Sequence, residues 1–249
     1  MINQIKKIVM VGFSIIFLSS ITLNALLYRE LRKYYTQLYA VELDPLGFSH
    51  FQDETVPQTN SKSTLVFFGD SRAAQWFAPQ LENYTFINRG IGNQTSTQVL
   101  LRFEEHIQPL KPDILVIQVC INDLKTIPLF PERKQQIIAT CEENIELLVQ
   151  KTLDLDATVI LTTVFPTSGN IPLARTLVWS NDIYEAIKEV NRYILSLKNE
   201  EVIIFDTASI LSDPKGNIKL EYVYDLLHLN DEGYEVLNVE LVQILEYPK

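Results

Sequence analysis

The sequence predicts an α/β domain, with a parallel sheet covered by helices on both faces, behind an N-terminal transmembrane helix. From residue 64 onward, short apolar runs alternate with longer segments of helical spacing. The apolar runs are nearly continuous, which is typical of parallel strands that are buried on both faces. Near the N-terminus, residues 8–28 carry no charged side chain, and a helix of that length can cross a bilayer.

Residues 1–28 are expected to form a short cytoplasmic tail and a single-pass membrane anchor. Basic residues lie on both sides of the apolar stretch, with Lys6 and Lys7 before it and Arg29 after it. A cleaved signal peptide is the main alternative, but its apolar core should be shorter and end in a small-x-small site, and residues 23–28 (Leu-Asn-Ala-Leu-Leu-Tyr) make a poor cleavage site. Because the N-terminal tail is so short, we expect the tail inside and the following domain on the extracytoplasmic side.

The next segment, residues 29–62, is expected to be a stalk and linker, followed by one domain over residues 63–249. A helical pattern continues to Ala40 and is broken by Asp44-Pro45-Leu46-Gly47, and the following residues are mostly polar. Within the domain the expected strands are 64–68, 85–88, 114–119, 158–164 and 202–205. The expected helices are a short one after Ser71 and others over 96–107, 132–152, 181–198 and about 231–245.

Composition excludes several classes of function. The formal net charge is −10 and the pI is near 4.8, which argues against a nucleic-acid partner. The two cysteines, Cys120 and Cys141, form no CxxC motif and have no histidine cluster beside them, so a zinc site is not expected. Two buried free thiols are the favoured interpretation, with a disulfide left open.

Polar residues follow the ends of the predicted strands, where open α/β sheets place their ligands. Ser71 follows the first strand in Gly69-Asp70-Ser71, either as a nucleophile or as part of a capped turn. Asn122 follows the third strand, where its side-chain amide could donate to an oxyanion or form a turn. Near the C-terminus, Asp225 and His228 lie three residues apart before the last helix. This spacing lets the carboxylate hold the imidazole as a general base.

Together these residues resemble the SGNH hydrolase superfamily, also called GDSL esterases and lipases. The resemblance covers Gly69-Asp70-Ser71, the run Asn88-Arg-Gly-Ile-Gly-Asn-Gln-Thr95, Ile121-Asn122-Asp123 and Asp225-Leu-Leu-His228, in the family's order. It implies a flavodoxin-like three-layer α/β/α sandwich with a five-stranded parallel sheet, and serine esterase chemistry without a metal or cofactor. By position, Ser71 matches the nucleophile, His228 the base, Asp225 the orienting acid and Asn122 the oxyanion-hole amide.

Two positions depart from the family's pattern. The resemblance places a backbone oxyanion donor at Asn93, where the family has glycine, and Gly92 is the alternative. Asn tolerates a positive φ better than most residues, so Asn93 is kept beside the N–H of Ser71 as a donor. At the position of Cys120 the family has a glycine. The Cys120 side chain is expected to narrow the bottom of the site beside Ser71.

The substrate is expected to be a small acyl ester, with O-acetyl groups of a glycan or a lipid as examples. Arg72, Leu177 and Trp179 are candidate pocket residues, although each could equally belong to the surface or the core of the domain. Transfer of the acyl group to a surface polysaccharide and a non-catalytic, membrane-tethered binding domain are the alternative functions. The acyl chain length, the alcohol portion and the oligomeric state do not follow from the sequence.

Overall fold

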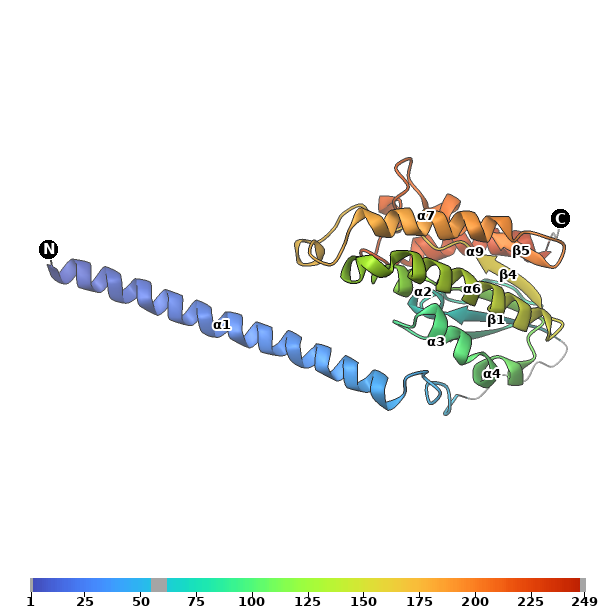
Figure 1. Ribbon diagram of the computed structural model, residues 1–249, viewed down its shortest axis with the longest axis horizontal. Helices are drawn as coiled ribbons and strands as arrows, with labels where there is room; N and C mark the ends of the chain where they lie inside the picture. The colour runs from blue at the N-terminus through green and yellow to red at the C-terminus, as the bar shows by residue number, and fades with distance from the viewer. Residues whose placement is uncertain (1, 55–61, 247–249) are drawn as a thin grey trace. The chain divides into compact units, whose positions relative to one another are not determined.

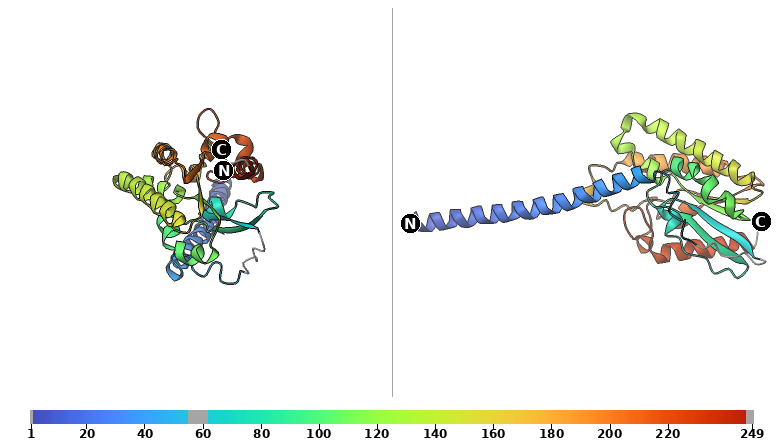
Figure 2. Two further views of the ribbon diagram at one scale, coloured as in Figure 1. Left: turned by 90° about the vertical axis from the view of Figure 1, so that its right-hand side faces the viewer. Right: turned by 90° about the horizontal axis from the view of Figure 1, so that it is seen from below.

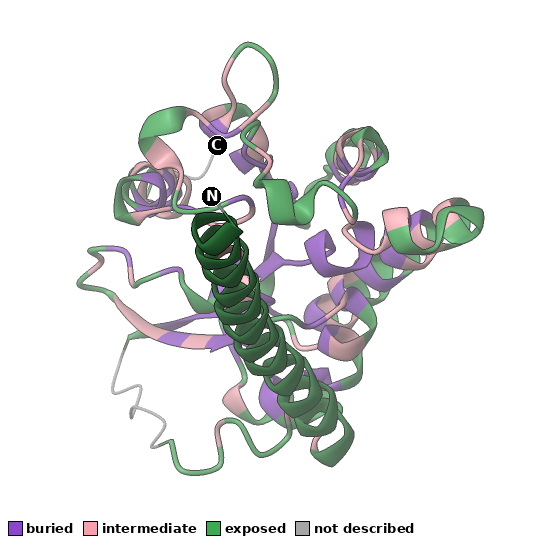
Figure 3. Ribbon diagram, turned by 90° about the vertical axis from the view of Figure 1, so that its left-hand side faces the viewer, coloured by how far each residue is buried: buried purple, intermediate pink, exposed green. Residues whose placement is uncertain are grey.

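The computed structural model describes residues 2–54 and 62–246, and the chain divides into two compact units, Met1–Pro45 and Leu46–Lys249. The first unit is a single helix, α1 (Ile2–Leu43), without a buried residue along its length (Figure 3). It is long and apolar enough to cross a membrane. The anchor predicted over 8–28 and the helical pattern after it thus form one uninterrupted helix.

The second unit is built on a five-stranded parallel sheet with the strand order β2-β1-β3-β4-β5. The central strand pairs are in a register that brings their carboxyl ends to one level, with Gly69 opposite both Gly90 and Gln118. The strands are β1 (Ser63–Gly69), β2 (Tyr84–Gly90), β3 (Ile114–Gln118), β4 (Thr158–Thr162) and β5 (Val202–Phe205).

Helices cover both faces of this sheet (Figures 1 and 2). One face is covered by α3 (Ser96–Leu101), α4 (Phe103–His106), α6 (Lys134–Leu153) and α7 (Asn181–Ser196), and the other by α8 (Thr207–Leu211) and α9 (Asp231–Glu246). Two further short helices, α2 (Ser71–Ala74) and α5 (Ile121–Leu124), follow β1 and β3 at their carboxyl ends.

Alternate residues of each central strand belong to two separate hydrophobic cores. In β1, Val66 and Phe68 pack on the α6 side, whereas Leu65 and Phe67 pack on the α9 side. Successive side chains of a strand point to opposite faces, so a strand covered on both faces needs an apolar residue at every position. This explains the continuous apolar runs and confirms the predicted three-layer α/β/α fold.

Most predicted elements lie within a few residues of their observed bounds, and two regions differ. The helix expected over 96–107 is divided into α3 and α4 at Arg102, whose side chain is fully buried. The stalk expected over 29–62 is also divided. Its first part belongs to α1, residues 46–54 belong to the compact unit of the sheet, and residues 55–61 lie outside the described part of the chain.

Candidate active site

The end of β1 places Ser71 at the carboxyl edge of the sheet. Gly69 lies so close to β3 that a Cβ atom at this position would be 1.8 Å from the carbonyl oxygen of Gln118. Only glycine fits such an approach. Asp70 then caps α2, because its Oδ1 accepts a hydrogen bond of 2.9 Å from the N–H of Arg72. Ser71 is thereby the first residue of α2, with its side chain partly accessible.

His228 and Asp225 approach Ser71 from the loop before α9. The Nε2 atom of His228 lies 2.9 Å from the Oγ atom of Ser71. On the other side of the ring, Nδ1 lies 2.9 Å from Oδ2 and 3.0 Å from Oδ1 of Asp225. This is the geometry in which a serine hydroxyl can pass its proton to an imidazole that a carboxylate holds in place.

The Asp225 carboxylate is fixed by its own backbone. Its Oδ1 accepts hydrogen bonds of 2.8 Å from the N–H groups of both Leu227 and His228. Partial burial raises the pKa of this carboxyl, but the hydrogen bonds from the His228 ring and from the two backbone N–H groups outweigh it and leave the pKa below its usual value. Asp225 therefore remains an anion that orients the ring.

The turn over residues 91–94, called here the oxyanion turn, lies beside Ser71. A Cβ atom on Gly92 would be 3.9 Å from the Cβ atom of Ser71. Asn93 has a φ of +65°, in the left-handed region that Asn tolerates better than most residues. The turn is joined to β1 by a hydrogen bond of 3.0 Å from the N–H of Ile91 to the carbonyl of Gly69.

Asn122 faces the same turn from α5. Its Nδ2 atom donates a hydrogen bond of 2.9 Å to the carbonyl of Gln94, and the side chain is buried. A carboxamide nitrogen carries two hydrogens, so a second N–H remains for an oxyanion. The neighbouring Asp123 is held by Ser96, whose N–H and hydroxyl donate to its carboxylate at 2.8 and 2.7 Å. These bonds fix α5 against the start of α3.

Arg72 is not available to a substrate, which corrects its prediction as a pocket residue. The side chain is fully buried, and its guanidinium donates to the carbonyls of Leu227, Phe165 and Pro166 at 3.0, 2.9 and 3.1 Å. Desolvation by burial lowers the pKa of this guanidinium to about 10, so it stays charged at neutral pH. Arg72 thus joins the serine helix to the loop that carries His228.

The other two predicted pocket residues, Leu177 and Trp179, differ from each other in exposure. Trp179 is nearly buried and packs in the core on the α6 side, which was the alternative interpretation of this residue. Leu177 is 92% exposed, in the loop between β4 and α7. It remains a candidate for contact with a substrate.

The cysteines differ from expectation. Cys120 and Cys141 form a disulfide that ties the residue before α5 to α6, so the preferred interpretation of two free thiols was wrong. Cys120 has a φ of +89°, the left-handed conformation that favours glycine. Both cysteines are fully buried within the core on the α6 side. The Cys120 side chain is therefore directed to α6 by its bond instead of narrowing the bottom of the site beside Ser71.

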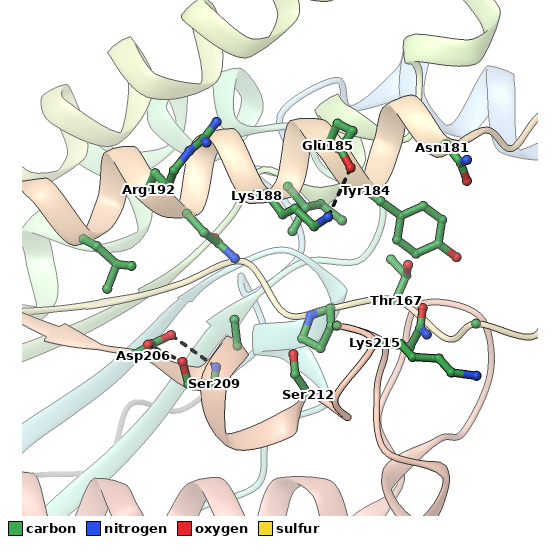
Figure 4. Close-up of a pocket in the computed structure, with 18 of the residues that line it drawn as sticks. Thr167, Asn181, Tyr184, Glu185, Lys188, Arg192, Asp206, Ser209, Ser212 and Lys215 are labelled. Atoms are coloured by element: carbon green, nitrogen blue, oxygen red, sulfur yellow. Dashed lines mark hydrogen bonds and ion pairs between the residues drawn. The ribbon is translucent and has the colours of Figure 1, made fainter.

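A cavity of about 730 Å³ lies apart from these residues, between α7 and α8 (Figure 4). Neither Ser71 nor His228 lines it. Its wall includes Lys188, which is paired with Glu185 at 3.1 Å, and Asp206, which accepts hydrogen bonds from Ser209. Among the residues that the structure describes, no group of three or more His, Cys, Asp or Glu side chains could hold a metal ion.

Comparisons with known proteins show the family and the fold of this domain. The family model described as the GDSL-like lipase/acylhydrolase family matches residues 55–236. Among solved structures, a GDSL-like lipase from Bacteroides thetaiotaomicron is 23% identical, with a TM-score of 0.65, over 81% of this chain and 98% of that one. A lipase/acylhydrolase from Enterococcus faecalis is 22% identical, with a TM-score of 0.56, over 74% and 95% of the two chains.

An acetyl xylan esterase from Geobacillus stearothermophilus is 20% identical, with a TM-score of 0.56, over 74% of this chain and 94% of that one. At these identities the solved structures show a shared fold. None of the curated proteins matches this sequence.

Proposed function

Because the chain belongs to the GDSL-like lipase/acylhydrolase family, we propose that it hydrolyses carboxylic esters through an acyl-enzyme formed on Ser71. The observation that carries this proposal is the distance of 2.9 Å between Oγ of Ser71 and Nε2 of His228, with Asp225 on the other side of the ring. Among the hydroxyl groups of the described residues, this one is paired with an imidazole that a carboxylate orients.

In the first half of the reaction, His228 accepts the hydroxyl proton while Oγ of Ser71 attacks the ester carbonyl carbon. The carbonyl oxygen becomes an oxyanion, for which the N–H groups of Ser71 and Asn93 and the Asn122 amide are the proposed donors. As the tetrahedral intermediate collapses, His228 gives its proton to the departing alkoxide, which leaves as an alcohol. The acyl group remains on Ser71.

In the second half, water replaces the alcohol. His228 takes a proton from the water as it attacks the acyl carbon, and the same donors hold the second oxyanion. Collapse returns the proton to Ser71 and releases a carboxylic acid. Asp225 stays ionised throughout and stabilises the imidazolium that forms in each half, as its lowered pKa favours.

For the substrate we propose small acyl esters, such as O-acetyl groups on a glycan or a lipid. The similarity in fold to an acetyl xylan esterase supports a small acyl group. An acceptor hydroxyl could take the place of water, and acyl transfer to a polysaccharide is therefore an outcome of the same test.

For the location we propose a membrane anchor in α1 with the catalytic domain on the extracytoplasmic side. The length and apolar character of α1 support the anchor. The disulfide between Cys120 and Cys141 supports an extracytoplasmic location of the domain, because disulfides persist in oxidising compartments and are rare in the cytosol.

The test is a series of p-nitrophenyl esters, from acetate to palmitate, with the purified full-length chain in detergent. We expect turnover that falls with acyl length and is abolished in Ser71→Ala, with an unchanged melting temperature. Product formed on an added sugar at the expense of hydrolysis would indicate a transferase. Full turnover in Ser71→Ala, or none in the wild type on any ester, would contradict the proposal.

A further inference from the structure

Residues 46–54, called here the brace, pack against the α/β domain although they precede the residues that the family model matches, 55–236. In the structure they belong to the same compact unit as the sheet (Figure 1), and Phe48 and Phe51 contact His106 at the end of α4. The brace contacts the turn over residues 91–94, the end of β2 and the end of α4.

The first contact is with the oxyanion turn. The side-chain nitrogen of Gln94 donates a hydrogen bond of 2.9 Å to the main-chain carbonyl of Leu46. The main-chain carbonyl of the same Gln94 accepts the hydrogen bond from the Asn122 amide at 2.9 Å. Gln94 is almost completely buried, so one residue connects the brace to the proposed oxyanion donor of α5.

The second contact fixes the other end of the brace. Glu54 forms an ion pair with Arg89, which is buried and directly precedes the Gly90-Ile91 entry to the turn. The guanidinium of Arg89 also lies over the ring of Phe51, 4.4 Å from its centre. The Phe51 ring meets His106 edge to face at 5.1 Å, and Nε2 of His106 lies 3.4 Å from the carbonyl of Phe48.

Arg102 joins these contacts to the strand of the nucleophile. Its Nε atom donates to Oε1 of Gln94, and its Nη2 atom donates to the carbonyl of Gly69 at 2.8 Å. Arg102 also contacts Nδ1 of His106 at 3.2 Å. The side chains of Gln94 and Arg102 thus connect the brace both to the oxyanion turn and to the residue two positions before Ser71.

We infer that the brace positions the oxyanion turn for catalysis, with Gly47 and Gln94 as positioning residues. The inference rests on the proposed esterase function. Donors of an oxyanion hole act only when they are held in place before the charge develops, and a displacement of about 1 Å costs roughly 10- to 100-fold in rate. The backbone of the turn is bonded to β1 through Ile91, and the side chain of Gln94 is bonded to the brace, so the turn is held from two sides.

Gly47 offers a direct test, because a side chain added there would meet side chains of the turn. It has a φ of +72°, and a Cβ atom there would lie 2.8 Å from Cδ1 of Ile91 and 3.1 Å from Nε2 of Gln94. Gly216 is its matched control, since it has a φ of +85° and a Cβ atom there would meet nothing within 4 Å. Gly47→Ala and Gly216→Ala therefore both place a side chain in the left-handed region, and only in the first does the new methyl group meet side chains of the oxyanion turn.

The experiment measures kcat, KM and melting temperature for both variants of the full-length chain, with p-nitrophenyl acetate. We expect kcat to fall roughly 10-fold or more in Gly47→Ala and to stay within about twofold in Gly216→Ala, with similar melting temperatures. KM and the pH midpoint of kcat should be unchanged, because the brace touches neither His228 nor Asp225 among the described contacts.

Gln94→Glu is the second variant. It keeps the acceptor for Arg102 but places an oxygen against the carbonyl of Leu46, so its kcat should fall as in Gly47→Ala. If the wild type has an activity that depends on Ser71, two results would overturn the inference. One is equal kcat values for Gly47→Ala and Gly216→Ala, and the other is a loss confined to KM or to the melting temperature. If the wild type has no such activity, the proposed function itself fails.

Discussion

Nε2 of His228 lies 2.9 Å from Oγ of Ser71, although 157 residues separate them in the chain. The serine is placed by the end of β1 and the histidine by the loop before α9. Arg72 spans the two, because it follows Ser71 directly and donates to the carbonyl of Leu227, which precedes His228. The alignment of the pair thus depends on a buried cation that does not itself face the substrate.

Asn122→Ala should lower kcat by roughly 100- to 1,000-fold with little change in KM, the typical loss for one oxyanion donor. The variant also frees the Gln94 carbonyl that the amide now holds. Steady-state kinetics with p-nitrophenyl acetate measure the effect. A kcat within threefold of the wild type would remove Asn122 from the proposed oxyanion hole.

The conservative change Arg72→Lys should destabilise the domain. One ammonium cannot satisfy the three carbonyls that the guanidinium binds, and each buried polar group left unpaired costs about 1–3 kcal/mol. We expect the free energy of unfolding in urea to fall by about 2–4 kcal/mol. Arg192→Lys on the exposed side of α7 is the matched control, and an equal effect of the two variants would contradict the role of Arg72.

The order of elements and the positions of Ser71, Asn122, Asp225 and His228 at the ends of elements could be predicted from the sequence. A strand buried on both faces is apolar at nearly every position, as in residues 65–68, so the polar residues that follow such a run are easy to recognise. Arg72 could not be placed in this way, because a cation in the first turn of a helix is normally solvated. Its burial depends on carbonyls contributed by distant loops.

The disulfide and the brace escaped prediction for other reasons. Cys120 and Cys141 lie on different elements, and only the packing of α5 on α6 brings them together. The expected extracytoplasmic location was nevertheless a signal in favour of a disulfide. Residues 46–54 read as a polar linker because they bind through a carbonyl, an ion pair and scattered aromatic rings, which leave no periodic pattern.

Loss of the disulfide should lower stability by about 3 kcal/mol, the usual effect for a closed loop of roughly 20 residues. Cys141→Ser, or treatment of the wild type with a reductant, should lower the melting temperature. The variant itself should no longer respond to the reductant. An identical response of wild type and Cys141→Ser would show that the bond does not form in the protein.

The pH dependence of stability should change in Asp70→Asn. Burial raises the pKa of Asp70 to about 6, so the folded protein retains a proton there that the unfolded chain, with an ordinary pKa of 3.8, has lost. Asp70 therefore destabilises the fold increasingly as the pH rises from about 4 to about 6. Relative to wild type, the free energy of unfolding of Asp70→Asn should rise by up to about 3 kcal/mol between pH 4 and pH 7. Urea titrations at both values test this, and a difference that does not vary with pH would contradict it.

The most direct test of the account is covalent labelling of the full-length chain with a fluorophosphonate, followed by mass spectrometry of the labelled peptide. The proposed geometry predicts a single adduct on Ser71, strongly slowed in His228→Ala and absent in Ser71→Ala. Labelling on another residue, or equally rapid labelling without the His228 imidazole, would contradict the assignment of Ser71 as the activated nucleophile.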